Sequence, residues 1–322
     1  ALHLIRQLVE EEGIACDFHP HGDLCVAFKP SHFEGFRERA AWHKKHLGHA
    51  LQLIPPADLR QAIGSDAYFG GVVDPHGASL HPAKLVFGLA EVAARYGAQL
   101  CPRTPATRIT REGGGFAVHT PRGRLRAREV IVATNGYTGH TLPGLRSRVI
   151  PVGSYSIVTE PLSPALQAEI SPRRYVFWDS KWFLNYFRLT PDGRLLWGGR
   201  NNLSTNLDLR KSADILRAQM VRAFPQLAGV AVTHSWSGRL GLTFDLMPHI
   251  GRIEGVHYVL GFGGHGLHMA LYLGREVAQL LTGEKTGTPF AEIPHPTRFF
   301  YRNRPWFMPL VVWYYRFRDW RS

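Results

Sequence analysis

Residues 257–282 read HYVLGFGGHGLHMALYLGREVAQLLT. The pattern predicts a buried strand at residues 258–260, a glycine-rich turn, and a helix that begins near Gly266. Four glycines in six residues (261–266) remove side chains from the turn. A flat ligand can therefore approach backbone N–H groups at the point where a helix dipole begins. This stretch predicts a binding site for an electron-rich ring or an anion.

The helix after the turn is predicted to be buried. Its apolar residues share one face, which comprises Leu267, Ala270, Leu271, Gly274, Ala278 and Leu281. The small residues at 270, 274 and 278 are spaced by four, so the pattern favours close packing against another backbone on that face.

Gly261, Gly263 and Gly266 also match the GxGxxG pattern of dinucleotide-binding folds. Such a fold requires a second strand with an acidic residue about 20 positions on. Here the helix is followed by the Pro-rich segment TGEKTGTPFAEIPHP, which disfavours a first βαβ unit at this place. A tight turn before a core helix remains as a plainer alternative.

Length and composition indicate an ordinary globular protein. The 322 residues suggest two domains, because a domain has about 150 residues. No apolar run reaches the roughly 18 residues of a membrane span. The net charge is +13, but the arginines are scattered, so no nucleic-acid partner is expected. Three cysteines, an odd number without metal-binding spacing, favour a reduced, cytoplasmic location.

Histidines 43, 46 and 49 recur at i, i+3 and i+6 of a predicted helix and suggest metal ligands. No cysteine or carboxylate accompanies them in sequence, so the pattern favours a solvated basic face over a metal site.

Other segments complete the outline. A helix is predicted from His81, and the apolar run 130–134 indicates a strand of a parallel sheet that is covered on both faces. In residues 149–200, apolar and polar side chains alternate or apolar runs are divided by turn residues, which predicts an antiparallel sheet. Its aromatic residues are predicted to form one face, which is core by default but can also line a pocket; they are Tyr155, Trp178, Trp182, Tyr186 and Phe187. The aromatic and basic residues 299–320 are expected to pack on the body or on a membrane surface.

Seven motifs in order resemble the D-amino-acid oxidase superfamily of FAD-dependent oxidoreductases, and within it the γ-glutamylputrescine oxidase-like branch. They are GGVVDPHGASLHPAKLVFGLA, VIVATNGYT, RVIPVGSYSIVTEPL, NYFRLTPDGRLLWGGR, FPQL, WSGRLGLTFDLMPHIG and GFGGHGLHMALYLG. Together they extend through most of the chain and are far more specific than any one of them.

The resemblance implies a mixed α/β fold with a parallel-sheet FAD domain interleaved with an antiparallel-sheet substrate domain, the flavin lying between them. The implied FAD-binding ranges are 1–13, 75–148 and 231–284, and the substrate domain comprises 14–74 and 149–230. Residues 285–322 form a C-terminal tail. The family's first βαβ unit, with its GxGxxG motif, would precede residue 1.

The resemblance also implies a reaction. An FAD-dependent oxidase would oxidise the C–N bond of a small-molecule amine, γ-glutamylputrescine-like or related, by hydride transfer to flavin, with O2 as electron acceptor. One alternative is a dehydrogenase that passes electrons from an amino acid to another acceptor. Another is an inactive relative that acts only as a binding module.

Site residues follow from the turn and the resemblance together. The predicted catalytic residues are His265, Tyr186 and Arg188, and the predicted substrate pocket has Tyr155, Trp178 and His268. Predicted cofactor contacts are Thr107, Ile109, Ala133, Thr134, Asn135, Gly136, Trp236, Gly238, Gly263, Gly264, His265, Gly266 and Leu267.

Two lysines of sarcosine-oxidase relatives are absent by this alignment. The lysine that holds a substrate carboxylate is replaced by His268, and the oxygen-activating lysine falls near Leu196. Absence of the lysine that holds the carboxylate favours an amine as substrate over an α-amino acid.

Overall fold

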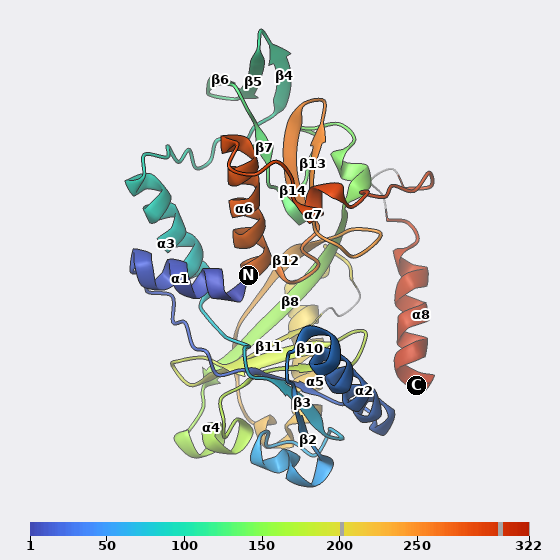
Figure 1. Cartoon of the computed structure of the whole chain (residues 1–322). Helices are drawn as coiled ribbons and strands as arrows, with labels where there is room; N and C mark the ends of the chain where they lie inside the picture. The colour runs from blue at the N-terminus through green and yellow to red at the C-terminus, as the bar shows by residue number, and fades with distance from the viewer. Residues whose placement is uncertain (200–202, 302–304, 322) are drawn as a thin grey trace. The chain divides into compact units, whose positions relative to one another are not determined.

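The chain divides into two compact units in the structure, a computed structural model that describes residues 1–199, 203–301 and 305–321 (Figure 1). Unit 1 comprises Ala1–Cys16, Pro82–Val152 and Arg239–Trp306, and unit 2 comprises Asp17–His81, Gly153–Gly238 and Phe307–Ser322. The predicted substrate range 14–74 and 149–230 falls in unit 2 apart from residues 14–16 and 149–152. The predicted tail is divided between the two units.

An eight-stranded sheet, in the order β12-β8-β11-β10-β9-β1-β3-β2, is the frame of unit 2. Its strands are β1 (Asp23–Val26), β2 (Gln52–Ile54), β3 (Gly71–Asp74), β8 (Ile150–Pro161), β9 (Val176–Asp179), β10 (Asn185–Leu189), β11 (Arg194–Gly199) and β12 (Val232–Leu242). The pairs β9–β10, β10–β11 and β11–β8 are antiparallel, as the alternation predicted, whereas β1 and β9 are parallel. Residue 200, the last of the predicted range, lies outside the described residues.

Stacked aromatic rings form the centre of the unit 2 core. Phe187 lies between Phe177 and Trp197, with ring centroids 5.0 and 4.5 Å away, and Phe224 meets Phe187 edge-on at 5.5 Å. All four side chains are at most 1% exposed. The predicted single aromatic face is therefore wrong for Phe187, because neighbouring residues of a strand point to opposite faces. Phe187 faces the core while Tyr186 faces the other side.

Unit 2 also contains the helices α2 (Pro30–Leu47), α4 (Pro164–Ile170), α5 (Leu209–Ala223) and α8 (Met308–Arg321), and the 3-10 turns η1 (Pro56–Gln61) and η4 (Pro225–Leu227). Unit 1 has α1 (Leu2–Glu12), α3 (Pro82–Arg95), α6 (Gly266–Thr282), α7 (Pro289–Glu292), η2 (Asn135–Tyr137) and η3 (Leu145–Arg148).

Unit 1 contains two small sheets. β13 (His249–Ile253), β14 (Val256–Leu260) and β7 (Ile131–Val132) make one, with β14 parallel to β7. β4 (Arg108–Glu112), β5 (Gly115–Thr120) and β6 (Gly123–Ala127) make an antiparallel second sheet. The prediction that residues 130–134 are covered on both faces is wrong: β7 is an edge of its described sheet, and Ile131 is 45% exposed.

Helix α6 begins at Gly266, as predicted, but buries a different face. Leu273 and Val277 pack against Ile250 and Val259 of β13 and β14. Ala270, Gly274 and Ala278, by contrast, are exposed, so the predicted close-packed face is wrong. The helix is apolar around much of its circumference, and periodicity alone therefore did not select the face that meets the strands.

The tail packs on the body at two places. Tyr301 is 1% exposed, and its hydroxyl donates to the carbonyl of Val149 in unit 1 at 2.9 Å. In unit 2, Asp319 of α8 accepts the backbone N–H groups of Trp182 and Phe183 at 2.9 and 3.2 Å. No described helix has the length and apolarity needed to cross a membrane.

Candidate functional site

The glycine turn between β14 and α6 is held by contacts to distant parts of unit 1. Gly261, Gly263 and Gly264 have φ of 90°, 58° and 105°, values that other residues rarely adopt. The Gly263 N–H donates to the carbonyl of Gly241 at 3.0 Å, and the Gly261 N–H donates to Oδ1 of Asn135 at 3.0 Å. The backbone path of the turn is therefore fixed from two sides.

Asn135 and Gly136 lie against the end of β12. Asn135 has a left-handed backbone, with φ of 43°. A Cβ on Gly136 would lie 2.7 Å from the carbonyl oxygen of Arg239, and a Cβ on Gly241 would overlap Oδ1 of Asn135. Three segments far apart in sequence thus approach backbone to backbone, which only glycines at these positions permit.

The start of α6 presents unused donors. Among the described residues, no acceptor lies within hydrogen-bond range of the N–H groups of Gly264, Gly266 and Leu267. Gly264 and Leu267 are exposed. Because α6 is 17 residues long, the positive end of a full helix dipole lies at this place. This geometry suits an electron-rich group.

Two histidines occupy the first turn of this helix. His265 is exposed, and its ring lies 5.8 Å from that of His268 in an edge-on arrangement. Burial lowers the pKa of His268, and charge on His265 lowers it further. His268 is therefore neutral at pH 7 and adds no positive charge to this place.

The remaining predicted cofactor residues of unit 1 lie in or directly beside β4 and β7. Thr107 donates its N–H and its hydroxyl to the carbonyl of His119, at 2.8 and 3.1 Å, and thereby extends the β4–β5 pairing. Ile109 packs against the core cluster that contains Val132. Ala133 lies directly before Thr134, whose hydroxyl hydrogen-bonds that of Thr138 at 2.9 Å.

Unit 2 brings one predicted substrate residue, Trp178, and two predicted catalytic residues, Tyr186 and Arg188, to one face of its sheet. Tyr186 pairs across the strands with Trp178 on one side and with Gly198 on the other. Its ring covers Gly198, where any Cβ would overlap it, and its hydroxyl hydrogen-bonds Ser154 and Ser156 at 3.0 and 3.2 Å. Trp178 and Tyr186 are thus neighbours in one row of the sheet.

Two further side chains lie near this row. Arg188 follows Tyr186 on the same face of β10; its guanidinium donates to the carbonyl of Leu80 at 3.0 Å, and burial lowers its pKa. The indole N–H of Trp178 donates to Asp23 at 2.8 Å. Burial raises the pKa of Asp23, a residue that sequence reasoning missed because its only signal was its place in a short strand.

Tyr155 lies on the opposite, core side of the sheet. It is 1% exposed, and its hydroxyl both donates to the carbonyl of Ser204 and accepts the N–H of Leu207. The structure gives it a packing role. Trp236 and Gly238 lie on β12, where Trp236 is 42% exposed.

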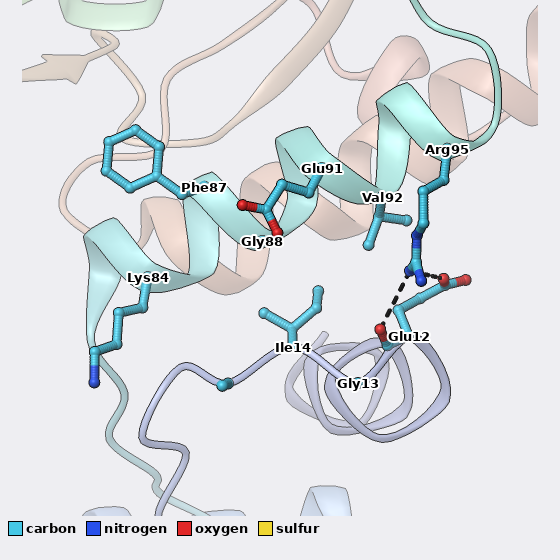
Figure 2. Close-up of a pocket in the computed structure, with 10 residues that line it drawn as sticks. Glu12, Gly13, Ile14, Lys84, Phe87, Gly88, Glu91, Val92 and Arg95 are labelled. Atoms are coloured by element: carbon cyan, nitrogen blue, oxygen red, sulfur yellow. Dashed lines mark hydrogen bonds and ion pairs between the residues drawn. The ribbon is translucent and has the colours of Figure 1, made fainter.

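A separate cavity of about 540 Å³ lies between α1 and α3 in unit 1 (Figure 2). Figure 2 shows Arg95 reaching from α3 to Glu12, with 2.9 Å between Nη2 and Oε2. Ile14 packs under Gly88, where a Cβ would overlap it. None of the predicted site residues lines this cavity.

Comparison with known proteins identifies relatives over nearly the whole chain. The model of the family described as "FAD dependent oxidoreductase" (DAO) matches residues 1–280. Gamma-glutamylputrescine oxidoreductase of Escherichia coli (strain K12) is 32% identical over 91% of this chain and 68% of its own length. The probable oxidoreductase OrdL of Rhizobium meliloti (strain 1021) is 34% identical over 89% and 66%, respectively. The chain thus spans about two thirds of the length of these relatives.

Solved structures show the same fold at lower identity. Glycine oxidase from Geobacillus kaustophilus superposes with a TM-score of 0.77 at 20% identity, covering 93% of this chain and 80% of that one. L-proline dehydrogenase from P. horikoshii gives a TM-score of 0.74 at 22% identity, covering 90% and 79%.

Proposed function

Because the chain belongs to the FAD-dependent oxidoreductases of the D-amino-acid oxidase family, we propose that it oxidises the C–N bond of an amine, γ-glutamylputrescine-like or related, with O2 as electron acceptor. The observation that carries the proposal is the start of α6, where the N–H groups of Gly264, Gly266 and Leu267 at a glycine-rich turn have no acceptor among the described residues. The name of the E. coli relative supports the amine class.

The residues of the glycine turn fit a flavin. We assign Gly263, Gly264, His265, Gly266 and Leu267 to its electron-rich carbonyl edge, which accepts hydrogen bonds; the available backbone donors there are the N–H groups of Gly264, Gly266 and Leu267. The dipole of α6 stabilises negative charge there by about 0.3–2 kcal/mol. FAD, when bound, supplies the hydride acceptor for the carbon beside the substrate nitrogen. The protein's own task at this place is to hold donors where charge develops.

The unit 2 face supplies the substrate contacts of the proposal. The rings of Trp178 and Tyr186, neighbours across two strands, attract a cationic amine during its capture. Arg188, on the same face, pairs with a carboxylate at the far end of the substrate. A substrate with an amine at one end and a carboxylate at the other, such as a γ-glutamyl amine, satisfies both groups.

Neutral His268 also favours an amine. A lysine at this position would repel a substrate ammonium group, whereas an uncharged imidazole does not. We further propose a cytoplasmic location, because Cys16, Cys25 and Cys101 are all free thiols.

Anaerobic titration of the FAD-loaded protein tests the function. We expect γ-glutamylputrescine to bleach the flavin faster than putrescine, glycine or D-alanine, and air to restore the colour. Faster bleaching by glycine or D-alanine would indicate an amino-acid enzyme, and a flavin that none of these compounds reduces would indicate a binding module. A reduced flavin that a dye reoxidises but air does not would indicate a dehydrogenase.

The variant Arg188→Met tests recognition of the substrate carboxylate independently of recognition of the amine. It should raise the KM for γ-glutamylputrescine by about 10-fold or more, the scale of one charge-assisted pair, and leave putrescine unchanged. An equal change in KM for γ-glutamylputrescine and putrescine would show that Arg188 does not bind the substrate carboxylate.

A further inference from the structure

Two histidines and one aspartate of unit 2 converge outside the proposed flavin and substrate residues. Nε2 of His49 lies 3.0 Å from Oδ2 of Asp74, and Nδ1 of His76 lies 3.5 Å from Oδ1. One nitrogen or oxygen of each residue lies within 4.8 Å of the others, and the two imidazole rings are 4.8 Å apart. The sequence pattern does not reveal this group, because His49 recurs with His43 and His46, whereas Asp74 and His76 lie on a different segment.

The backbone fixes each of the three positions. His49 directly follows Gly48, which ends α2 in a left-handed conformation with φ of 63°. Asp74 is the last residue of β3 and is paired with Asp23 of β1. The next turn is tight, because a Cβ on Gly77 would overlap the backbone nitrogen of Asp23. His76 is therefore presented beside Asp74 by a turn that has little freedom.

Charge at the group favours a cation. The carboxylate of Asp74 accepts the backbone N–H of His76 at 2.9 Å and lies 3.0 Å from Nε2 of His49. A carboxylate thus faces two imidazoles, which are neutral ligands when deprotonated. The three side chains are 25%, 36% and 73% exposed, so an ion can reach them from solvent.

The spacing is compatible with a metal site. Zinc bonds of about 2.0–2.1 Å at tetrahedral angles place neighbouring ligand atoms about 3.3 Å apart. Nε2 of His49 lies 3.0 Å from Oδ2 of Asp74 and Nδ1 of His76 lies 3.5 Å from Oδ1, so each imidazole is near that distance from a different carboxylate oxygen, and one ligand atom of each residue lies within 4.8 Å of the others. Two imidazoles and a carboxylate also form a donor set that zinc and similar ions accept.

We propose that His49, Asp74 and His76 bind a divalent transition metal ion such as Zn²⁺. The ion ties the end of α2 to the turn after β3 and keeps one coordination position open. A further imidazole stands nearby: the ring of His43 is 6.1 Å from that of His49, and its buried Nδ1 has no hydrogen-bond partner among the described residues. Movement of His43 would bring in a fourth ligand.

Zinc titration of the metal-free, FAD-loaded protein tests the proposal, with bound zinc measured by equilibrium dialysis. We expect one tight equivalent and a rise in Tm on its addition, because a ligand that binds only the folded state stabilises it. His49→Ala and His76→Ala should each weaken that equivalent by at least about 100-fold, because loss of a mere partner of a metal ligand already costs about 10- to 100-fold. His46→Ala should leave it unchanged, since His46 stacks on Trp42 on an exposed face of α2.

The outcome that overturns the proposal is equal zinc affinity in the parent and in the His49→Ala/His76→Ala double variant. Zinc would then bind at other side chains, such as the histidines that remain of the 17 in the chain. If His49→Ala does not fold by circular dichroism, His76→Ala decides alone, because it changes only an exposed turn.

Discussion

His265 is the residue on which the proposed mechanism depends most directly. It is exposed at the start of α6, beside the unused N–H groups. His265→Ala removes a side-chain donor and leaves the helix dipole in place. Flavin reduction by amine should slow by about 10-fold, equivalent to roughly 1.4 kcal/mol of transition-state stabilisation. Anaerobic stopped-flow measures the rate, with His140→Ala, another exposed histidine of unit 1, as control. An unchanged reductive rate would give His265 a purely structural role.

His295 should make stability depend on pH. Its Nε2 donates to the carbonyl of Arg148 at 3.0 Å, its Nδ1 accepts the Tyr258 hydroxyl at 3.0 Å, and its ring stacks on His249 at 4.0 Å. Burial lowers the pKa of His295 to about 4, from the ordinary 6.5. The unfolded chain therefore binds more protons between pH 6.5 and 4, and the free energy of unfolding should fall as pH falls through that range.

Chemical denaturation at several pH values measures this dependence, and His295→Gln should flatten it. A slope that the variant leaves unchanged would assign the pH dependence to other groups.

At the scale of elements, the glycine turn and the helix that follows it offer a matched pair of substitutions. Gly264 has φ of 105°, so Gly264→Ala should destabilise the protein by about 1–3 kcal/mol and weaken FAD binding. Gly274→Ala, within α6, meets nothing within 4 Å and should instead stabilise by about 0.5–1 kcal/mol. Thermal melting and flavin fluorescence measure both effects. Similar FAD affinity in the two variants would contradict the assignment of the turn to the flavin.

Helix α8 should depend on one carboxylate. Asp319 accepts two backbone N–H groups, and Tyr315 packs on Trp182 with ring centroids 4.6 Å apart. Asp319→Ala leaves those donors unpaired, and local opening of residues 308–321 should become easier by about 1–3 kcal/mol, more than for Asp319→Asn. Hydrogen exchange of the helix measures this.

Helix α8 also exposes Leu310, Trp313 and Tyr314. These apolar side chains form the surface that is expected to contact lipid. Cosedimentation with anionic vesicles tests that expectation. Recovery of the protein entirely in the supernatant would leave α8 as a packing element alone.

At the scale of the whole molecule, thiol reactivity reports on folding. Cys16 and Cys25 are buried and Cys101 is exposed. Burial also raises the pKa of Cys25 to about 12, which suppresses its thiolate. The native protein should therefore release one equivalent of chromophore from an aromatic disulfide reagent, and three after denaturation. Rapid reaction of two or three thiols in the native state would show that Cys16 or Cys25 becomes accessible without global unfolding.

The sequence by itself determined the elements that local patterns specify. The turn and helix at residues 257–282, the helix from Pro82 and the antiparallel pairing of β8–β11 follow from glycine positions, capping and alternation, which act over a few residues. Motifs in order along most of the chain determined the family, because their combination is rare even though each alone is weak.

Only the tertiary structure decided which residues meet. Three features join segments that are separated in sequence. They are the hydrogen bond from the Gly261 N–H to Asn135, the packing of one face of α6 on the strands, and the group of His49, Asp74 and His76. The reason is physical: a local pattern states that a side chain is apolar or polar, but the packing of the remaining chain selects its neighbour. The aromatic residues of the sheet illustrate this, since one row faces the core and its neighbours in sequence face the proposed substrate.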